Sequence, residues 1–263
     1  MPSDAGWFLI ARHDRECPHE RLMSAPPPCQ APPNLTPASL TPANLGAALD
    51  GRLPPPGARI GLFGGSFNPA HDGHRQITEE ALRRLALDRV WWLVSPQNPL
   101  KPARGMAPLA ERMASARSLA AGNPRILVTA LEGVLGSTYT ADTLATLTRL
   151  LPRVRFVWLM GADNLIQVHQ WQDWPQIFNS LPVAVFDRPT YSLGALSSKA
   201  ARAFARYRLK ERSARRLAEA RPPAWVFIRC RLNPQSATEI RARQPMRTDA
   251  VARRAKATAQ GND

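Results

Sequence analysis

Short, almost wholly apolar segments recur along the chain from Arg59 onward, and their alternation with helix-like segments constrains the fold more than any other feature. Runs of this length that are apolar at nearly every position are typical of strands buried on both faces. Such strands belong to parallel sheets covered by helices. We therefore predict one α/β domain. Its expected strands are 59–63, 90–94, 125–130, 154–159, 182–186 and 225–228.

The segments between these strands place apolar residues at helical spacing. The first is expected to bury Ile77, Ala81 and Leu85 on one face, and a later one carries Trp171 and Trp174 three residues apart. Strands and helices together predict a single Rossmann-like, doubly wound parallel sheet with helices on both faces. The other expected helices are 108–121, 140–151 and a long one over 194–220.

Residues 1–57 differ from the rest because they hold twelve of the 26 prolines. Proline donates no backbone hydrogen bond, and the segment has no apolar periodicity that would build a packed element. We predict a flexible Pro-rich extension, ordered only where it docks on the body, whose removal leaves stability nearly unchanged. The expected boundaries are 1–57 for the extension, 58–245 for the α/β domain and 246–263 for a basic tail.

The net charge of +15 is concentrated near the C-terminus, since residues 199–221 sum to +7 and residues 241–263 to +4. Clustered Lys and Arg can bind nucleic acid by releasing counterions from phosphates. They can also form a solvated face that attracts small polyanionic substrates. We favour the solvated face, because no recognised nucleic-acid-binding module accompanies the charge.

Cysteine usage and hydropathy indicate the compartment. Cys17, Cys29 and Cys230 are an odd set without metal-ligand spacing. No stretch approaches the roughly 18 uncharged residues of a membrane span. We expect a reduced, cytoplasmic setting without membrane contact.

The segment Gly64–His74 lies between the first expected strand and the first expected helix. Ligands of open α/β sheets bind at the carboxyl ends of strands, where helix N-termini present N–H groups. Gly64 and Gly65 permit close approach of a polyphosphate, and His71 and His74 can face the same phosphate group. A helix cap and a metal site are alternatives for the two histidines. The Gly-Gly turn after a strand favours phosphate binding.

A second candidate phosphate site follows the last expected strand. Ser236-Ala-Thr-Glu239 has the spacing of a capping box and therefore marks a helix start, whatever its function. Arg241 falls within the first turns of that helix. A helix N-terminus with an arginine suits the far side of a triphosphate.

These motifs resemble those of a known family. Gly64-Gly-Ser-Phe-Asn-Pro-Ala-His-Asp-Gly-His74 resembles the G-G-S/T-F-D/N-P-x-H-x-G-H signature of the adenylyltransferase branch of the nucleotidyltransferase superfamily. Ser236–Arg241 is similar to its second motif, S-S/T-T-x-I/L-R, with Ala237 in place of a hydroxyl residue. Between them, stretches similar to bacterial nicotinate-nucleotide adenylyltransferases are Thr138–Leu144, Met160–Leu165 with Trp171 and Trp174, and Asp187–Pro189. Thr190 stands where that family usually has Gly. The resemblance runs from about Arg59 to Arg243.

The resemblance implies transfer of the adenylyl group of ATP to nicotinate mononucleotide, giving deamido-NAD and pyrophosphate, with Mg²⁺ accompanying ATP. The expected partners are these two substrates, and no metal site built from side chains is expected. Adenylyl transfer to phosphopantetheine or to nicotinamide mononucleotide remains an alternative, as does a basic nucleic-acid-binding protein. The oligomeric state stays open.

The resemblance also implies roles for individual residues. The catalytic residues would be His71, His74 and Arg241. The ATP-binding residues would be Gly64, Gly65, Ser66, Phe67, Asp163, Ser236 and Thr238. The residues that bind nicotinate mononucleotide would be Lys101, Tyr139, Thr140, Trp171 and Arg188.

Three of these residues have a second interpretation from the sequence alone. Trp171 could be a core residue, as we expect for Trp174, rather than a stacking partner of the nicotinate ring. Asp163 could cap the helix after its strand. Lys101 could be a solvated loop lysine.

Overall fold

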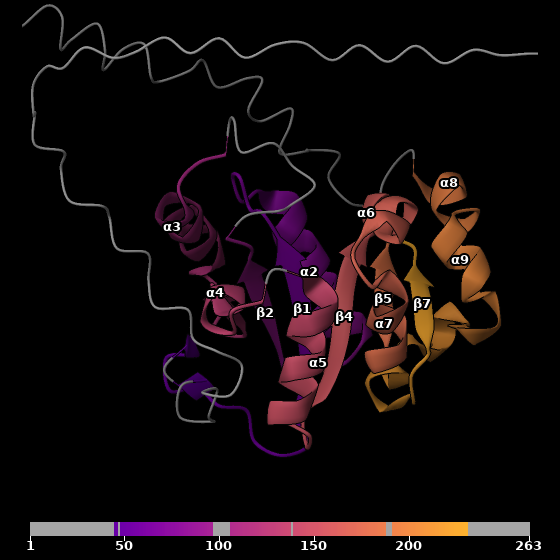
Figure 1. The fold of residues 1–263 in the computed structure, drawn as a ribbon, viewed down its shortest axis with the longest axis horizontal. Helices are drawn as coiled ribbons and strands as arrows, with labels where there is room; N and C mark the ends of the chain where they lie inside the picture. The colour runs from indigo at the N-terminus through magenta and orange to yellow at the C-terminus, as the bar shows by residue number, and fades with distance from the viewer. Residues whose placement is uncertain (1–44, 47, 97–105, 138, 188–190, 231–263) are drawn as a thin grey trace, which may run out of the picture. The chain divides into compact units, whose positions relative to one another are not determined.

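The sheet is the centre of the molecule. The computed structural model describes residues 45–46, 48–96, 106–137, 139–187 and 191–230. Its seven strands have the order β3-β2-β1-β4-β5-β7-β6, and every neighbouring pair is parallel. The predicted α/β class is therefore confirmed. The strands are β1 (Arg59–Gly65), β2 (Arg89–Val94), β3 (Ile126–Thr129), β4 (Arg155–Gly161), β5 (Val183–Phe186), β6 (Arg208–Leu209) and β7 (Trp225–Ile228). Figure 1 labels β1, β2, β4, β5 and β7.

The strand order reverses at β1, and this reversal positions the site. The chain steps from β1 outward to β2 and β3, then returns to place β4 on the other side of β1. Phe63 of β1 is opposite Trp92 of β2 and Leu159 of β4. At such a switch point, the loops that leave β1 and β4 diverge to opposite faces and open a crevice at their carboxyl ends.

Helices cover both faces of the sheet, because strand side chains of both orientations are buried. In β2, for example, Trp91 packs into the core on one face and Trp92 into the core on the other. One face is covered by α2 (Asp72–Arg84), α3 (Leu109–Ala120) and the 3-10 helix η4 (Glu211–Glu219). The other is covered by α4 (Leu131–Val134), α5 (Thr140–Leu150), α6 (Ala162–Gln167), η2 (Val168–Gln170), α7 (Trp174–Ser180), α8 (Ser192–Leu196), α9 (Lys199–Ala203) and η3 (Ala205–Tyr207).

The prediction of one long helix over 194–220 was wrong. The segment breaks into α8, α9, η3, β6 and η4. Ser198 starts a new helix, because its side chain accepts a hydrogen bond from the Ala201 amide at 3.2 Å. Arg208 and Leu209 then pair with β7 and extend the sheet by one strand that the sequence pattern had not indicated.

Packing begins well before the expected boundary at residue 58. The side chains of Leu45 and Leu49 are 1% and 0% exposed and belong to the core on the α5 face. The Thr129 hydroxyl donates to the Ala48 carbonyl at 3.0 Å and attaches this segment to the end of β3. The last part of the segment predicted as a flexible extension is therefore part of the packed body.

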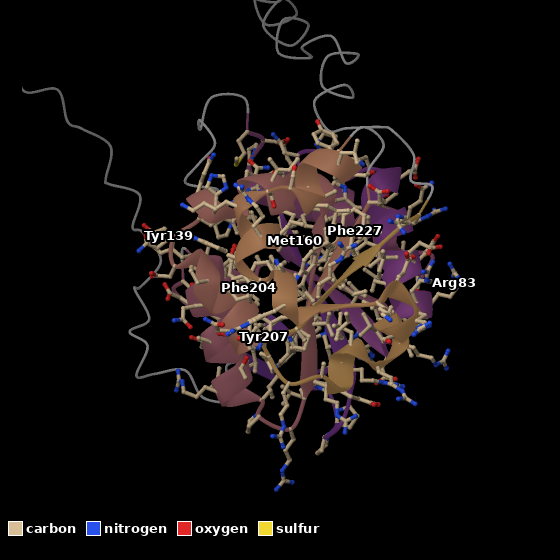
Figure 2. The ribbon with its side chains drawn as sticks, turned by 90° about the vertical axis from the view of Figure 1, so that its right-hand side faces the viewer. Arg83, Tyr139, Met160, Phe204, Tyr207 and Phe227 are labelled. Carbon is tan, nitrogen blue, oxygen red and sulfur yellow. The ribbon has the colours of Figure 1, made fainter. Side chains whose placement is uncertain are left out.

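The Trp-rich stretch does not form the single helix expected for Trp171 and Trp174. Trp171 ends η2, whereas Trp174 begins α7, and Asp173 between them has a φ of 48°. Trp174 meets the rings of Phe178 and Phe204 edge-on at centroid distances of 6.3 and 5.9 Å. Figure 2 labels Phe204 together with Tyr207, whose ring lies 6.2 Å from that of Phe204. The core role expected for Trp174 agrees with these contacts.

No helix among the described residues is long and apolar enough to cross a membrane.

Candidate active site

The two histidines of the Gly64–His74 segment lie together at the start of α2, as predicted. His71 is the N-cap residue and His74 the third residue of the helix. Their ring centroids are 3.9 Å apart, and the His71 amide donates to Nδ1 of His74 at 3.2 Å. The pair therefore caps the helix and also presents two imidazoles at a helix N-terminus. Capping and phosphate binding are thus compatible interpretations.

Residues of the adjoining core hold His74 in place. Its ring lies 4.6 Å from that of Phe67, which stacks on Trp92 at 5.1 Å with an interplanar angle of 22°. Trp92 Nε1 donates to the Thr78 hydroxyl at 2.7 Å, and that hydroxyl donates to the His74 carbonyl at 2.8 Å. Rings packed in this way lose little further entropy when a ligand binds, so the site is organised in advance.

Gly64 is required here for a reason that the sequence did not reveal. A Cβ at this position would lie 2.5 Å from the Cη2 atom of Trp158, on the neighbouring strand β4. Because the Trp158 ring is buried, it has no room to move away. The absence of a side chain at Gly64 thus leaves room for the Trp158 ring beside the end of β1.

The end of β4 contributes Asp163 to the same edge of the sheet. Gly161, with extended backbone angles, is the N-cap of α6, and Asp163 lies in the first turn. Asp163 is therefore not the capping residue, which was one of its two interpretations. Its position directly after β4, the neighbour of β1 at the switch point, is compatible with the nucleotide interpretation, which stays a prediction.

Three of the residues expected to recognise nicotinate, Tyr139, Thr140 and Trp171, lie on the α5 face. Tyr139 is the N-cap of α5 and Thr140 its first residue, so their amides are at a helix N-terminus. The Tyr139 side chain is 43% exposed and lies at the periphery in Figure 2. Trp171 is half-buried and packs against the core of this face, so it has both a packed and an accessible part.

The remaining predicted site residues lie outside the described residues. They are Lys101, Arg188, Ser236, Thr238 and Arg241. Their roles stay predictions from the resemblance.

Two buried charged residues at this edge were missed by sequence reasoning. Arg112 of α3 is 2% exposed and Glu132 of α4 is 7% exposed. A signal for Arg112 existed, because it shares helical spacing with the buried Ala116 and Ala120 and therefore interrupts an apolar face. Glu132 gave no signal, because its burial depends on the loop after β2, where its side chain hydrogen-bonds with Ser95.

Burial raises the pKa of the Glu132 carboxyl from its usual 4.5 to about 7, and the hydrogen bond with Ser95 opposes this shift. Between these pH values the folded protein retains a proton that the unfolded chain has lost. The free energy of unfolding therefore falls as the pH rises from about 4.5 through about 7. At pH values well above about 7 the free energy of unfolding no longer falls because of Glu132, since the carboxyl is then ionised in both the folded and the unfolded state.

We expect Glu132→Gln to be more stable than the wild type above about pH 8, by on the order of 3 kcal/mol, because it cannot ionise. The two proteins should be nearly equal near pH 5. Urea unfolding at both pH values measures the difference, with the exposed Glu111→Gln on α3 as control. The same pH dependence for the wild type and Glu132→Gln would contradict this prediction.

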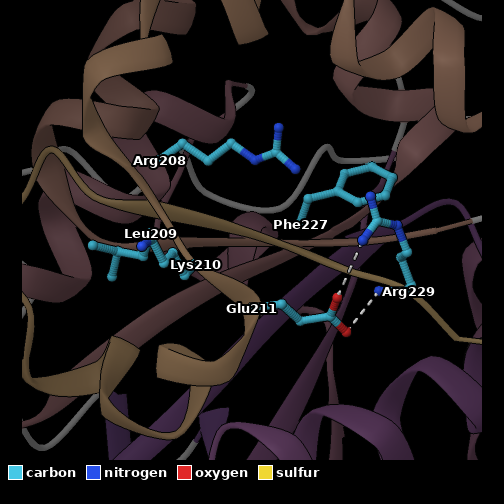
Figure 3. Close-up of a pocket in the computed structure, with 6 residues that line it drawn as sticks. All are labelled: Arg208, Leu209, Lys210, Glu211, Phe227 and Arg229. Carbon is cyan, nitrogen blue, oxygen red and sulfur yellow. Dashed lines mark hydrogen bonds and ion pairs between the residues drawn. The ribbon is translucent and has the colours of Figure 1, made fainter.

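A pocket of about 310 Å³ lies beside β6 and β7, the last two strands in the sheet order (Figure 3). Arg208, Lys210 and Arg229 give it a positive charge, and the Arg208 guanidinium lies 5.8 Å from the centroid of the Phe227 ring. Glu211 partly balances this charge and also pairs with Arg84 at 2.5 Å. Four of the six lining residues belong to the basic 199–221 segment, whose role in attracting anionic substrates stays a prediction.

Residues 62–243 match the cytidylyltransferase-like family, and this match covers more than half of the chain. The chain therefore belongs to the cytidylyltransferase-like family, as the parallel sheet and the histidine pair at its switch point suggest.

The relatives narrow this class. The chain is 58% identical over 170 residues to a probable nicotinate-nucleotide adenylyltransferase of Bradyrhizobium sp. (strain ORS 278), covering 65% of this chain and 88% of the relative. It is 54% identical over 185 residues to the protein of the same name from Methylorubrum extorquens (strain PA1), covering 70% and 100%. The predicted resemblance to nicotinate-nucleotide adenylyltransferases is confirmed.

Solved structures agree on the fold. Nicotinic acid mononucleotide adenylyltransferase of Plasmodium falciparum has been solved in complex with APC and with NaAD. These structures align with TM-scores of 0.52 and 0.53 at 16% identity, covering 70% of this chain and 83% of theirs.

Proposed function

We infer that the protein is a nicotinate-nucleotide adenylyltransferase, which transfers the adenylyl group of ATP to nicotinate mononucleotide and releases pyrophosphate. The observation that carries this function is the pair His71 and His74 at a helix N-terminus beside the switch point of the sheet. Relatives that are 54–58% identical bear the name of this activity. The product, deamido-NAD, places the enzyme in NAD biosynthesis.

The nucleophile in this reaction is a phosphate oxygen of the mononucleotide. The second pKa of a phosphate monoester is about 6, so the nucleophile is largely ionised at neutral pH. The protein needs no general base and no covalent intermediate. Its task is to align the two phosphates and to neutralise the charge that develops on the transferred and leaving groups.

We propose that His71 and His74 stabilise this charge at the α-phosphate, with the amides of the Gly64–Phe67 segment nearby. An imidazole at a helix N-terminus is disfavoured as a cation, so the bound polyphosphate must favour the protonated form. Arg241 would neutralise charge on the leaving pyrophosphate. Asp163 would lie near the adenosine.

Mg²⁺ is part of the same proposal and enters bound to the triphosphate. Among the described residues, no three His, Cys, Asp or Glu side chains are grouped so that they could hold a metal ion. We assign the ion to the substrate, because Mg²⁺ in phosphoryl-transfer sites is bound largely through substrate phosphates. A cytoplasmic location completes the proposal.

Recognition of the nicotinate ring is proposed at Trp171 and the start of α5. The electron-poor ring suits an indole face, and such stacking contributes about 1 kcal/mol beyond area burial. The ring carboxylate would accept hydrogen bonds from amides near Tyr139 and Thr140, because a helix N-terminus favours an anion. This carboxylate would distinguish nicotinate from its amide.

A coupled assay for pyrophosphate release tests the function. ATP is supplied with nicotinate mononucleotide, nicotinamide mononucleotide or phosphopantetheine, and turnover is expected to be fastest with nicotinate mononucleotide. Preference for either other acceptor would assign the alternative reaction. No pyrophosphate release with any acceptor, combined with retention of duplex DNA near physiological salt, would favour the nucleic-acid-binding alternative.

Trp171→Ala is expected to raise the KM for nicotinate mononucleotide about tenfold and to change the KM for ATP little, because stacking is lost only at the ring. Steady-state kinetics with each substrate varied in turn measures this difference. Trp171→Phe, which keeps an aromatic face, should lie closer to the wild type. If Trp171→Ala unfolds the protein or raises both KM values equally, Trp171 is a core residue.

A further inference from the structure

Arg112 is a fully buried cation close to the candidate site. Its side chain lies on the face of α3 that also buries Met113 and Ala116. No carboxylate of the described chain is in an ion pair with it, and desolvation lowers the pKa of its guanidinium. A buried charge of this kind is expensive unless hydrogen bonds compensate it.

Four main-chain carbonyls provide this compensation. Arg112 Nε donates to the Ala107 carbonyl at 2.9 Å, and one terminal nitrogen donates to the carbonyls of Ser66 at 2.8 Å and Ser95 at 2.7 Å. The other terminal nitrogen donates to the Pro96 carbonyl at 2.7 Å. The guanidinium cation is the donor in all four hydrogen bonds, and all have normal lengths, so together they hold the side chain strongly and in one orientation.

The four carbonyls come from three segments at the carboxyl edge of the sheet. Ser66 follows β1 and begins the loop to the histidines, Ser95 and Pro96 follow β2, and Ala107 precedes α3. The Ser95 amide also donates to the Gly65 carbonyl at 3.0 Å. The guanidinium therefore connects the loop that follows β1 with the loop that follows β2, next to the last main-chain hydrogen bond between these two strands.

The hydrogen bond to the Ser66 carbonyl fixes the orientation of the whole peptide unit between Ser66 and Phe67. A trans peptide unit is planar, so the Phe67 N–H points away from the carbonyl that Arg112 binds. Phe67 has a φ of 47°, a left-handed conformation that is uncommon for a bulky residue and needs surrounding contacts to hold it. Arg112 supplies one such contact, and the stack of Phe67 on Trp92 supplies another.

We propose that Arg112 is a positioning residue for adenylyl transfer, which fixes the phosphate-binding loop after β1 relative to the end of β2. The proposal rests on the proposed function of the site. It gives Arg112 no contact with substrate. Its effect passes through the backbone of Ser66 and Phe67 on one side and of Ser95 and Pro96 on the other.

An apolar residue would avoid the cost of burying a charge, but it would leave the four carbonyls without this donor. The arginine instead matches three loop segments with its planar fork, which a single ammonium cannot do. A displacement of the reacting groups by about 1 Å can lower a rate about 100-fold. We therefore expect loss of the fork to lower kcat more than it changes either KM.

The experiment compares Arg112→Met and Arg112→Lys with Arg117→Met, an exposed position on the same helix. Steady-state kinetics is measured well below the melting temperature of each folded variant. Hydrogen–deuterium exchange of peptides that cover residues 64–71 and 93–96 is measured in parallel without substrate. The exchange measurement does not depend on the reaction, so it distinguishes failure of this proposal from failure of the proposed function.

In folded Arg112→Met we expect kcat to fall about 100-fold, each KM to change less than about threefold, and exchange in both loops to accelerate about tenfold relative to Arg117→Met. Arg112→Lys keeps a cation and a donor at this position but not the planar fork, so it should stay at least about tenfold below the wild type in kcat. If Arg112→Met does not fold, Arg112→Lys decides. Wild-type kcat in either Arg112 variant, loop exchange equal to that of Arg117→Met, or failure of both variants to fold would overturn the proposal.

Discussion

His74→Ala should lower kcat for adenylyl transfer about 100- to 1,000-fold, because it removes a preorganised donor from the transferring phosphate. The fold should survive, since His74 is only half-buried and the stack of Phe67 on Trp92 does not depend on it. Single-turnover kinetics at saturating substrates measures the chemical step, and circular dichroism checks the fold.

The structure provides a matched control for this substitution. His74 also accepts the His71 amide as the third residue of the helix, a position where glutamine serves equally well in capping boxes. His74→Gln should therefore keep the thermal stability of the wild type and show the low kcat of His74→Ala. If His74→Gln retains near wild-type turnover, the residue acts as a cap and not in charge stabilisation.

Leu49→Ala should lower the free energy of unfolding by about 2–5 kcal/mol, because the side chain is 0% exposed within the core on the α5 face. Urea unfolding measures this loss. Leu53→Ala is the control, since Leu53 is 43% exposed in the same segment and its truncation should cost less than about 1 kcal/mol. Equal effects would show that burial of Leu49 contributes nothing specific.

The same packing reverses an expectation from the sequence. Deletion of residues 1–57 removes Leu45 and Leu49 together, so it should destabilise the protein at least as much as Leu49→Ala does. A truncated protein with the melting temperature of the full chain would contradict this and restore the original expectation.

The strands that position the site could be predicted because their side chains are apolar on both faces, as in β2 and β5. The histidine pair could be predicted because its spacing and its place after a Gly-Gly turn are local features. Leu45 and Leu49 were obscured by the prolines around them. Their burial depends on a hydrophobic surface formed by distant parts of the chain.

The site features that could not be predicted from the sequence depend on contacts between segments that are distant along the chain. Arg112 binds carbonyls, which every residue has, so no partner is visible in the sequence. Glu132 is buried by the loop after β2, and Gly64 is required by the ring of Trp158 on another strand. Each of these effects depends on two segments that meet only after the sheet has formed.

The two-residue strand β6 has a consequence for the behaviour of the protein at high concentration. A long, flat, apolar outer strand would expose unpaired N–H and C=O groups on which a second molecule could add a strand. Here the last strand is only Arg208–Leu209, Lys210 follows it directly, and the Arg208 guanidinium lies over the rings of Trp225 and Phe227. The β6 edge of the described sheet is thus short and has cationic residues at both ends, which protects this edge against edge-to-edge aggregation.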